Sequence, residues 1–313
     1  MRMFLGAIGR VLVTLGLLLL LFVAYQLWGT GIYQARAQEN LKHDFQSELA
    51  RAHGGSGPTT SAPSTTGPSS PTSSTTTTTT TLPPLTAPAE GDVLARITIP
   101  KIGVDQYVVE GVDVADLRKG PGHYPATQLP GHEGNTAIAG HRTTYGAPFG
   151  NLDQLAAGDD IDLVTVQGHF TYEVTDLRAV DPSDVSVLDA TPDPKHAGRD
   201  LATLTLTTCN PKYSAAQRLV VKASLDLSGD QLALPPVPIP AGAHTTVGGL
   251  SGESSSRAPT LLWGAIAAAI GLLWWLWFHR YPRFTTWILG AIPFAVALFV
   301  AYTYLERLLP SNY

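Results

Sequence analysis

Three long apolar segments constrain what this chain can fold into more than any other feature. They run from Val11 to Trp28, from Ala258 to Phe278 and from Phe284 to Tyr304. Each is long enough to cross the hydrocarbon core of a bilayer as a helix. With 44% hydrophobic and only 14% charged residues among 313, the chain is too apolar at its ends for one soluble globule. We therefore predict N-terminal and C-terminal transmembrane helices on either side of a polar middle region.

Basic residues beside these segments predict their orientation. Arg2 and Arg10 lie at the first segment, and Arg280 and Arg283 lie in the short turn between the other two. Because such residues stay on the cytoplasmic side, we expect a multi-pass protein of the cell membrane whose polar middle region is extracytoplasmic. Two alternatives remain open: the first segment as the apolar core of a signal peptide, although no clear cleavage site follows it, and the last as a re-entrant hairpin bent at Pro293.

Composition divides the rest of the chain into a domain and two linkers. Leu41, Phe45 and Leu49 recur at the spacing of one helix face, which predicts a short helix that leaves the membrane as a spacer. A Thr/Ser/Pro-rich stretch with seven consecutive threonines, Thr75–Thr81, then predicts a disordered or extended stalk. The predicted units are an N-terminus with its membrane anchor (1–32), a juxtamembrane helix and stalk (33–91), a globular domain (92–228), a flexible linker (229–257) and a C-terminal transmembrane hairpin (258–313).

The globular segment has the length of one domain, about 140 residues. Short runs of alternating apolar and β-branched residues recur in it with turn signals between them, which predicts strands at 94–99, 106–109, 136–139, 161–166, 169–180, 203–208 and 218–225. Only 114–119 and 151–157 suggest helical turns. The pattern predicts a mostly β domain, built as an antiparallel barrel or a sandwich.

One cysteine, Cys209, ends the alternating run that begins at Leu204, and Arg218 begins the next predicted strand. Antiparallel pairing of these strands would bring the thiol and the guanidinium to one edge of a sheet. His141 follows another predicted strand. These three residue types suit one reaction, because a thiolate attacks carbonyl carbon, an imidazole moves protons, and a guanidinium holds an oxyanion. Two alternatives are an inert, buried Cys209 and His123 in place of His141 as the base.

Two further residues are candidate substrate contacts. Tyr124 offers a ring and a hydroxyl in a loop, and Thr208 adjoins the cysteine, although simple packing explains either equally well. An acidic stretch between Asp92 and Asp116 lacks the ligand spacing of a calcium site, so we interpret it as a solvated face and predict no metal site. A net charge of −5 and the lack of a basic patch argue against nucleic-acid partners.

Several ordered motifs resemble those of the sortases, the membrane-anchored cysteine transpeptidases of Gram-positive bacteria, and are most similar to class E sortases of actinobacteria. They span about Ile97 to Leu225 and include Ile-Pro-Lys-Ile-Gly-Val (99–104), Gly-Pro-Gly-His-Tyr-Pro-Ala-Thr (120–127), Ala-Gly-His-Arg-Thr-Thr-Tyr-Gly-Ala-Pro-Phe (139–149) and Thr-Leu-Thr-Thr-Cys-Asn-Pro (205–211). The resemblance implies an eight-stranded sortase barrel over 92–228, with Cys209, His141 and Arg218 as catalytic residues.

The same resemblance implies a reaction. Secreted proteins with a Leu-Ala-any-Thr-Gly sorting signal would be cut at the Thr–Gly bond through a Cys209 thioester and joined to an amine of a peptidoglycan precursor. No cofactor is expected, because the thioester conserves the energy of the peptide bond. Three alternatives stay open: a pilin-polymerising sortase with a pilin lysine as acceptor, another cysteine enzyme of the cell wall, and a non-catalytic stalked module that binds the wall.

Overall fold

The computed structural model of the chain describes residues 2–53, 87–189, 202–226, 233–239, 257–280 and 284–308. Its helices, in chain order, are α1 (Arg2–Ala24), the π-helical turn η1 (Tyr25–Gly29), α2 (Thr30–His53), α3 (Val114–Leu117), α4 (Arg257–Arg280) and α5 (Phe284–Leu308). Its strands are β1 (Val93–Ile99), β2 (Val104–Glu110), β3 (Gly122–His123), β4 (Gly134–Ala139), β5 (Asp160–Thr165), β6 (Gly168–Val180), β7 (Ala202–Asn210) and β8 (Gln217–Leu225).

The strands close into one barrel in the order β1-β2-β3-β4-β7-β8-β6-β5. The pairs β2–β3 and β4–β7 are parallel, and the others are antiparallel. The predicted β-barrel is therefore confirmed, and all seven predicted strands are present within two residues at either end. The strand that the sequence did not predict is β3, which is only two residues long.

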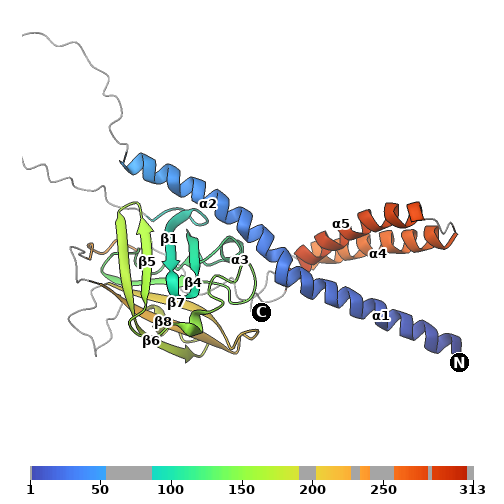
Figure 1. Cartoon of the computed structure of the whole chain (residues 1–313), viewed down its shortest axis with the longest axis horizontal. Helices are drawn as coiled ribbons and strands as arrows, with labels where there is room; N and C mark the ends of the chain where they lie inside the picture. Colours follow the sequence, from blue (N-terminus) through green and yellow to red (C-terminus); the bar gives the residue numbers. More distant parts are fainter. Residues whose placement is uncertain are drawn as a thin grey trace, which may run out of the picture.

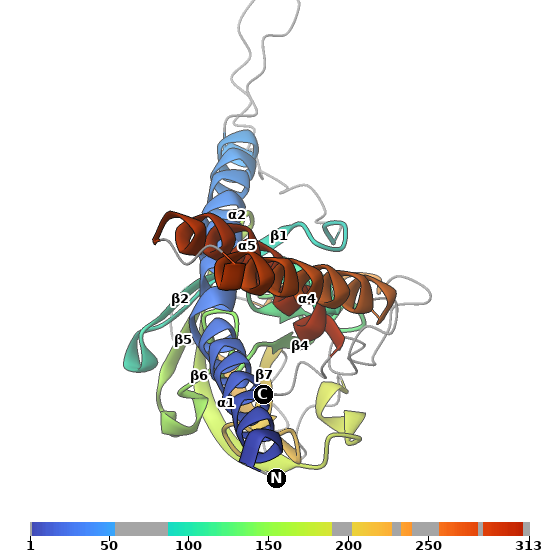
Figure 2. The same ribbon diagram turned by 90° about the vertical axis from the view of Figure 1, so that its right-hand side faces the viewer.

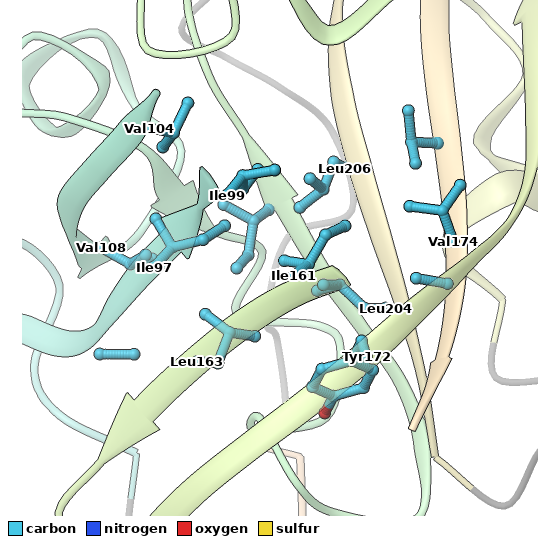
Figure 3. Packing of buried hydrophobic residues seen from close by; sticks show 14 of the residues in the cluster. Ile97, Ile99, Val104, Val108, Ile161, Leu163, Tyr172, Val174, Leu204 and Leu206 are labelled. Atoms are coloured by element: carbon cyan, nitrogen blue, oxygen red, sulfur yellow. The ribbon is translucent and has the colours of Figure 1, made fainter. Parts of the chain in front are cut away.

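Alternating apolar side chains fill the barrel, as Figure 3 shows for residues from β1, β2, β5, β6 and β7. Tyr172 is fully buried among them, and its hydroxyl accepts a hydrogen bond from the backbone N–H of Gly131 at 2.7 Å. A buried phenol needs such a partner, and burial raises the pKa of Tyr172 to about 12. The packed interior makes the barrel a rigid support for the loops at its ends.

The segment predicted as a short helix is helical in the structure (α2), and it packs on the barrel. It continues from α1 and lies along the barrel (Figure 1). Leu41 and Phe45 are buried against Val93 and Val109 of the barrel wall, and burying each is worth about 2 kcal/mol. The side-chain amide of Gln38 also pairs with the backbone of β2. The apolar face that the sequence assigned to a spacer is therefore an intramolecular contact surface.

The C-terminal helices α4 and α5 form a hairpin that projects away from the barrel (Figures 1 and 2). The stretches Arg257–Phe278 and Ile288–Leu305 are long and apolar enough to cross a membrane. In the described part of α1 the apolar stretch is shorter, Leu12–Ala24, so the N-terminal span stays a prediction. The predicted stalk lies almost wholly outside the described residues.

Part of the predicted flexible linker is packed on the barrel. Residues 233–239 run beside the β3–β4 connection, where Leu234 forms a parallel bridge with His132. The side chain of Gln128 donates to the carbonyl of Val237 at 3.1 Å and accepts from its N–H at 2.9 Å. The chain therefore stays attached to the domain beyond β8.

We predict that Phe45→Ala releases α2 from the barrel. The loss of a buried phenylalanine costs about 3–5 kcal/mol, and Phe45 packs with Val93 of β1 and Val109 of β2. Hydrogen exchange of the α2 backbone should accelerate while the barrel strands stay protected. Gln46→Ala changes the exposed neighbouring position on the same helix and should leave exchange unchanged. Equal protection of α2 in both variants would contradict the contact.

Candidate active site

The pairing of β7 with β8 places two of the predicted residues opposite each other. Cys209 and Arg218 are direct partners in the antiparallel register, one pair before the last pair of the ladder. The pairing predicted from the alternating sequence is therefore confirmed. Cys209 is 7% exposed, whereas Arg218 is half-buried and its Nη1 donates to the carbonyl of Gln217 at 3.1 Å.

The parallel pairing of β4 with β7 brings His141 to the same edge. Gly140 donates its N–H to the carbonyl of Thr207 at 3.0 Å, and its own carbonyl accepts from Oγ1 of Thr208 at 2.8 Å. His141 is the next residue along the chain. A Cβ at Gly140 would lie 2.5 Å from the Phe149 ring, so only glycine lets the loop fold back so tightly.

All five predicted site residues line one pocket, which encloses about 310 Å³ together with its open mouth. Its walls include the cysteine, the histidine and the arginine together with Tyr124 and Thr208. Tyr124 is 3% exposed, and its hydroxyl lies 3.1 Å from Oγ1 of Thr207. Tyr124 thus forms part of the buried wall of the pocket.

Two opposing effects set the acidity of the thiol. Burial raises the pKa of Cys209 above its ordinary value, while the positive charges of Arg218 and Arg142 act in the opposite direction. A buried thiolate is poorly solvated, and nearby cations offset that cost. Burial therefore favours the neutral thiol, and the two guanidinium groups offset part of that effect.

Arg142 is a site residue that sequence reasoning did not identify. Its side chain is 4% exposed, and its Nη1 donates to the carbonyl of Cys209 at 2.9 Å and to Oδ1 of Asn210 at 2.8 Å. Its Nη2 lies 3.1 Å from Oδ2 of Asp153. Arg142 thus ties the histidine loop to the backbone of the cysteine. In the sequence, only its position directly after His141 indicated that Arg142 lies near the site.

The histidine loop is also held from the N-terminal side. The ring of Tyr145 lies 5.1 Å from that of His141, centroid to centroid. The N–H of Tyr145 donates to Oγ1 of Thr30, at the start of α2, at 3.2 Å. The ring of Tyr33 packs edge-on against the ring of Tyr145. Tyr145 has a positive φ of 49°, which is uncommon for a side chain other than glycine. Helix α2 therefore contacts the loop that carries His141.

His123, the competing candidate base, lies elsewhere. It is 1% exposed, with Nδ1 at 2.8 Å from Oε2 of Glu110 and Nε2 at 2.9 Å from the carbonyl of Gln128. Both ring nitrogens thus have protein partners, and His123 does not line the pocket. This buried pair also corrects our interpretation of the acidic stretch as a solvated face, since Glu110 and Asp116 are both buried.

Comparisons with known proteins agree on one protein family. Residues 97–226 match the family model of the sortase domain. Sortase SrtE1 of Streptomyces coelicolor is 33% identical over 226 residues, 69% of this chain and 55% of that protein. Sortase SrtE2 of the same organism is 29% identical over 228 residues, 70% of this chain and 81% of that protein. The chain thus spans little more than half the length of the first relative.

A solved structure is also similar. Sortase E from Streptomyces avermitilis is 40% identical and aligns with 44% of this chain and 90% of its own, with a TM-score of 0.39.

Replacing Arg218 by glutamine should move the alkylation of Cys209 to higher pH. The substitution removes one of the charges that oppose the rise in the thiol pKa, so less thiolate forms at a given pH. The rate of modification by iodoacetamide across a pH series measures the shift. Arg218→Lys keeps the charge and should stay near the original profile. If the glutamine variant reacts with the original profile, the guanidinium does not act on the thiol.

Proposed function

Because residues 97–226 form a sortase domain and the chain therefore belongs to the sortase family, we propose that it is a cysteine transpeptidase. Cys209 is the nucleophile, His141 the acid and base, and Arg218 the oxyanion partner. The observation that carries the proposal is the single pocket that all three side chains line. The β7–β8 ladder fixes Cys209 opposite Arg218, and the β4–β7 ladder ends just before the loop that carries His141. The reacting groups are therefore positioned before substrate binds.

The first half of the reaction is acylation. The Cys209 thiolate attacks the carbonyl carbon of a Thr–Gly bond, and Arg218 stabilises the negative charge that develops on the carbonyl oxygen. His141, as imidazolium, gives its proton to the departing glycine amine as the C–N bond breaks. The product is a thioester between Cys209 and the threonine carbonyl. A substrate that fills the pocket must therefore meet an ionised thiol and a protonated imidazole together.

The second half is transfer to an amine. The acceptor nitrogen attacks the thioester carbon, and neutral His141 takes up the proton that the amine loses. The C–S bond then breaks and returns the thiolate of Cys209. Water can take the place of the amine, which gives hydrolysis as a side reaction.

The proposed substrates are secreted proteins with a Leu-Ala-any-Thr-Gly sorting signal, and the proposed acceptor is an amine of a peptidoglycan precursor. The similarity to the two Streptomyces sortases of the E type supports this choice. A pilin lysine is the second candidate acceptor, because the α4–α5 hairpin gives the chain a C-terminal membrane segment.

We also propose the membrane arrangement. The N-terminus (1–32) anchors the chain, the catalytic domain (92–228) is extracytoplasmic, and the hairpin (258–313) returns to the membrane. The apolar stretches of α4 and α5 support the last part, and the basic residues at the first segment support the orientation.

The full chain in detergent should join a Leu-Ala-any-Thr-Gly peptide to an amine acceptor, with the cut between Thr and Gly. Mass spectrometry identifies the product, which should be absent with Cys209→Ala. A Leu-Pro-any-Thr-Gly peptide should react more slowly. Acceptors that present a stem-peptide amine or a pilin lysine separate the two candidate acceptors.

Other outcomes of this assay have definite meanings. Hydrolysis without ligation would show that the acceptor is wrong. No cleavage of either peptide, together with a Cys209 that resists a peptidyl vinyl sulfone carrying the sorting sequence, would indicate a non-catalytic module.

The two histidines should respond differently to substitution. His141→Gln should lower kcat/KM by about 10²- to 10⁴-fold, the usual contribution of an acid or base. His123→Gln should lower the free energy of unfolding by about 1–3 kcal/mol, because Glu110 loses its buried partner. The folded fraction of that variant should keep its activity. Loss of activity in a stably folded His123→Gln variant would reverse the assignment.

A further inference from the structure

A second pocket lies where the barrel meets the apolar helices. Together with its open mouth it encloses about 720 Å³. It is bounded by η1 and the start of α2, by the loop that carries Tyr145, and by α5 through Phe299 and Thr303. Neither proposed half-reaction uses it. Its wall nevertheless includes Tyr145, whose ring contacts that of His141.

The pocket lies at the depth expected for lipid headgroups. Phe299 and Thr303 are close to the end of the apolar stretch Ile288–Leu305, and Tyr25 directly follows α1. The rings of Tyr25 and Phe299 pack edge-on, with centroids 5.3 Å apart. Aromatic side chains gather where a bilayer meets water. This placement rests on the membrane anchoring proposed above.

The charged side chains among the described residues that line the pocket are both basic. They are Arg36 and Arg118. Arg36 is exposed on α2, while Arg118 is 9% exposed and its guanidinium carbon lies 5.7 Å from the centroid of the Tyr145 ring. One guanidinium group can donate two parallel hydrogen bonds to the oxygens of a phosphate. The remaining wall is largely aromatic and aliphatic, which suits the glycerol and upper acyl part of a lipid.

We propose that this pocket binds the phosphate headgroup of an anionic membrane lipid. Arg36 and Arg118 contact the phosphate, and the acyl chains lie along the packed rings of Tyr25 and Phe299. A bound headgroup would lie against Tyr145, whose ring also contacts that of His141. The lipid would thus brace the loop that holds the catalytic histidine.

Native mass spectrometry of the full chain in detergent tests the site. Phosphatidylglycerol should be retained, whereas a diacylglycerol with the same acyl chains, which lacks the phosphate, should not. Arg36→Gln should weaken the retention of phosphatidylglycerol roughly tenfold, the effect of losing one charge-assisted hydrogen bond. Arg51→Gln removes the same charge from an exposed position on the same helix that does not line the pocket, and it should bind as the original chain does.

Three results would overturn the proposal. Equal retention of the diacylglycerol would mean that only acyl chains are bound. Unchanged binding by Arg36→Gln would place the lipid elsewhere. Displacement of phosphatidylglycerol by an equal concentration of inorganic phosphate would make the site one for free anions. Membrane sedimentation of the chain and the peptide ligation assay test the anchoring and the chemistry separately, since neither depends on the count of bound lipid.

Discussion

The backbone pairing of β7 with its two neighbours is the constraint on which the active site depends. Cys209 is opposite Arg218 because of the β7–β8 register, and Gly140 is beside Thr207 because of the β4–β7 register. A slip of one residue would turn every β7 side chain to the other face. The buried leucines of β7 resist such a slip, because their packing fills the barrel. Core packing and the geometry of the candidate site are therefore set by the same hydrogen bonds.

The histidine loop needs more support, because it is not part of a ladder. Its contacts include a hydrogen bond from Arg142 to the backbone of Cys209, packing of the Tyr145 ring on His141, and a hydrogen bond from the N–H of Tyr145 to Thr30 of α2. The last contact comes from a helix more than 100 positions earlier in the chain. The loop that carries His141 thus has a support outside the barrel.

Residue spacing in the sequence predicted the features that depend on neighbouring residues, namely the strands and the apolar face of a helix. Alternation identified seven strands, but the two residues of β3 are too few to show a period. Spacing identified an apolar face on α2 without indicating what covers it, because that partner is distant in sequence. The motif resemblance suggested Cys209, His141 and Arg218, whereas Arg142 and the buried Glu110–His123 pair become recognisable only once side chains are placed in space.

The docking of α2 on the barrel also sets the distance of the domain from the membrane in the arrangement proposed above. Contacts with the barrel begin at Thr30, directly after η1, and Leu41 follows 11 residues later, a rise of about 17 Å along the helix. The Thr-rich segment after His53 joins two elements of one packed unit, α2 and β1, so its length does not set the reach of the domain. Under the membrane arrangement proposed above, with α1 in the bilayer, the candidate pocket would stay near the membrane surface. A proposed substrate would then have to reach the pocket at that surface, before its release into the wall.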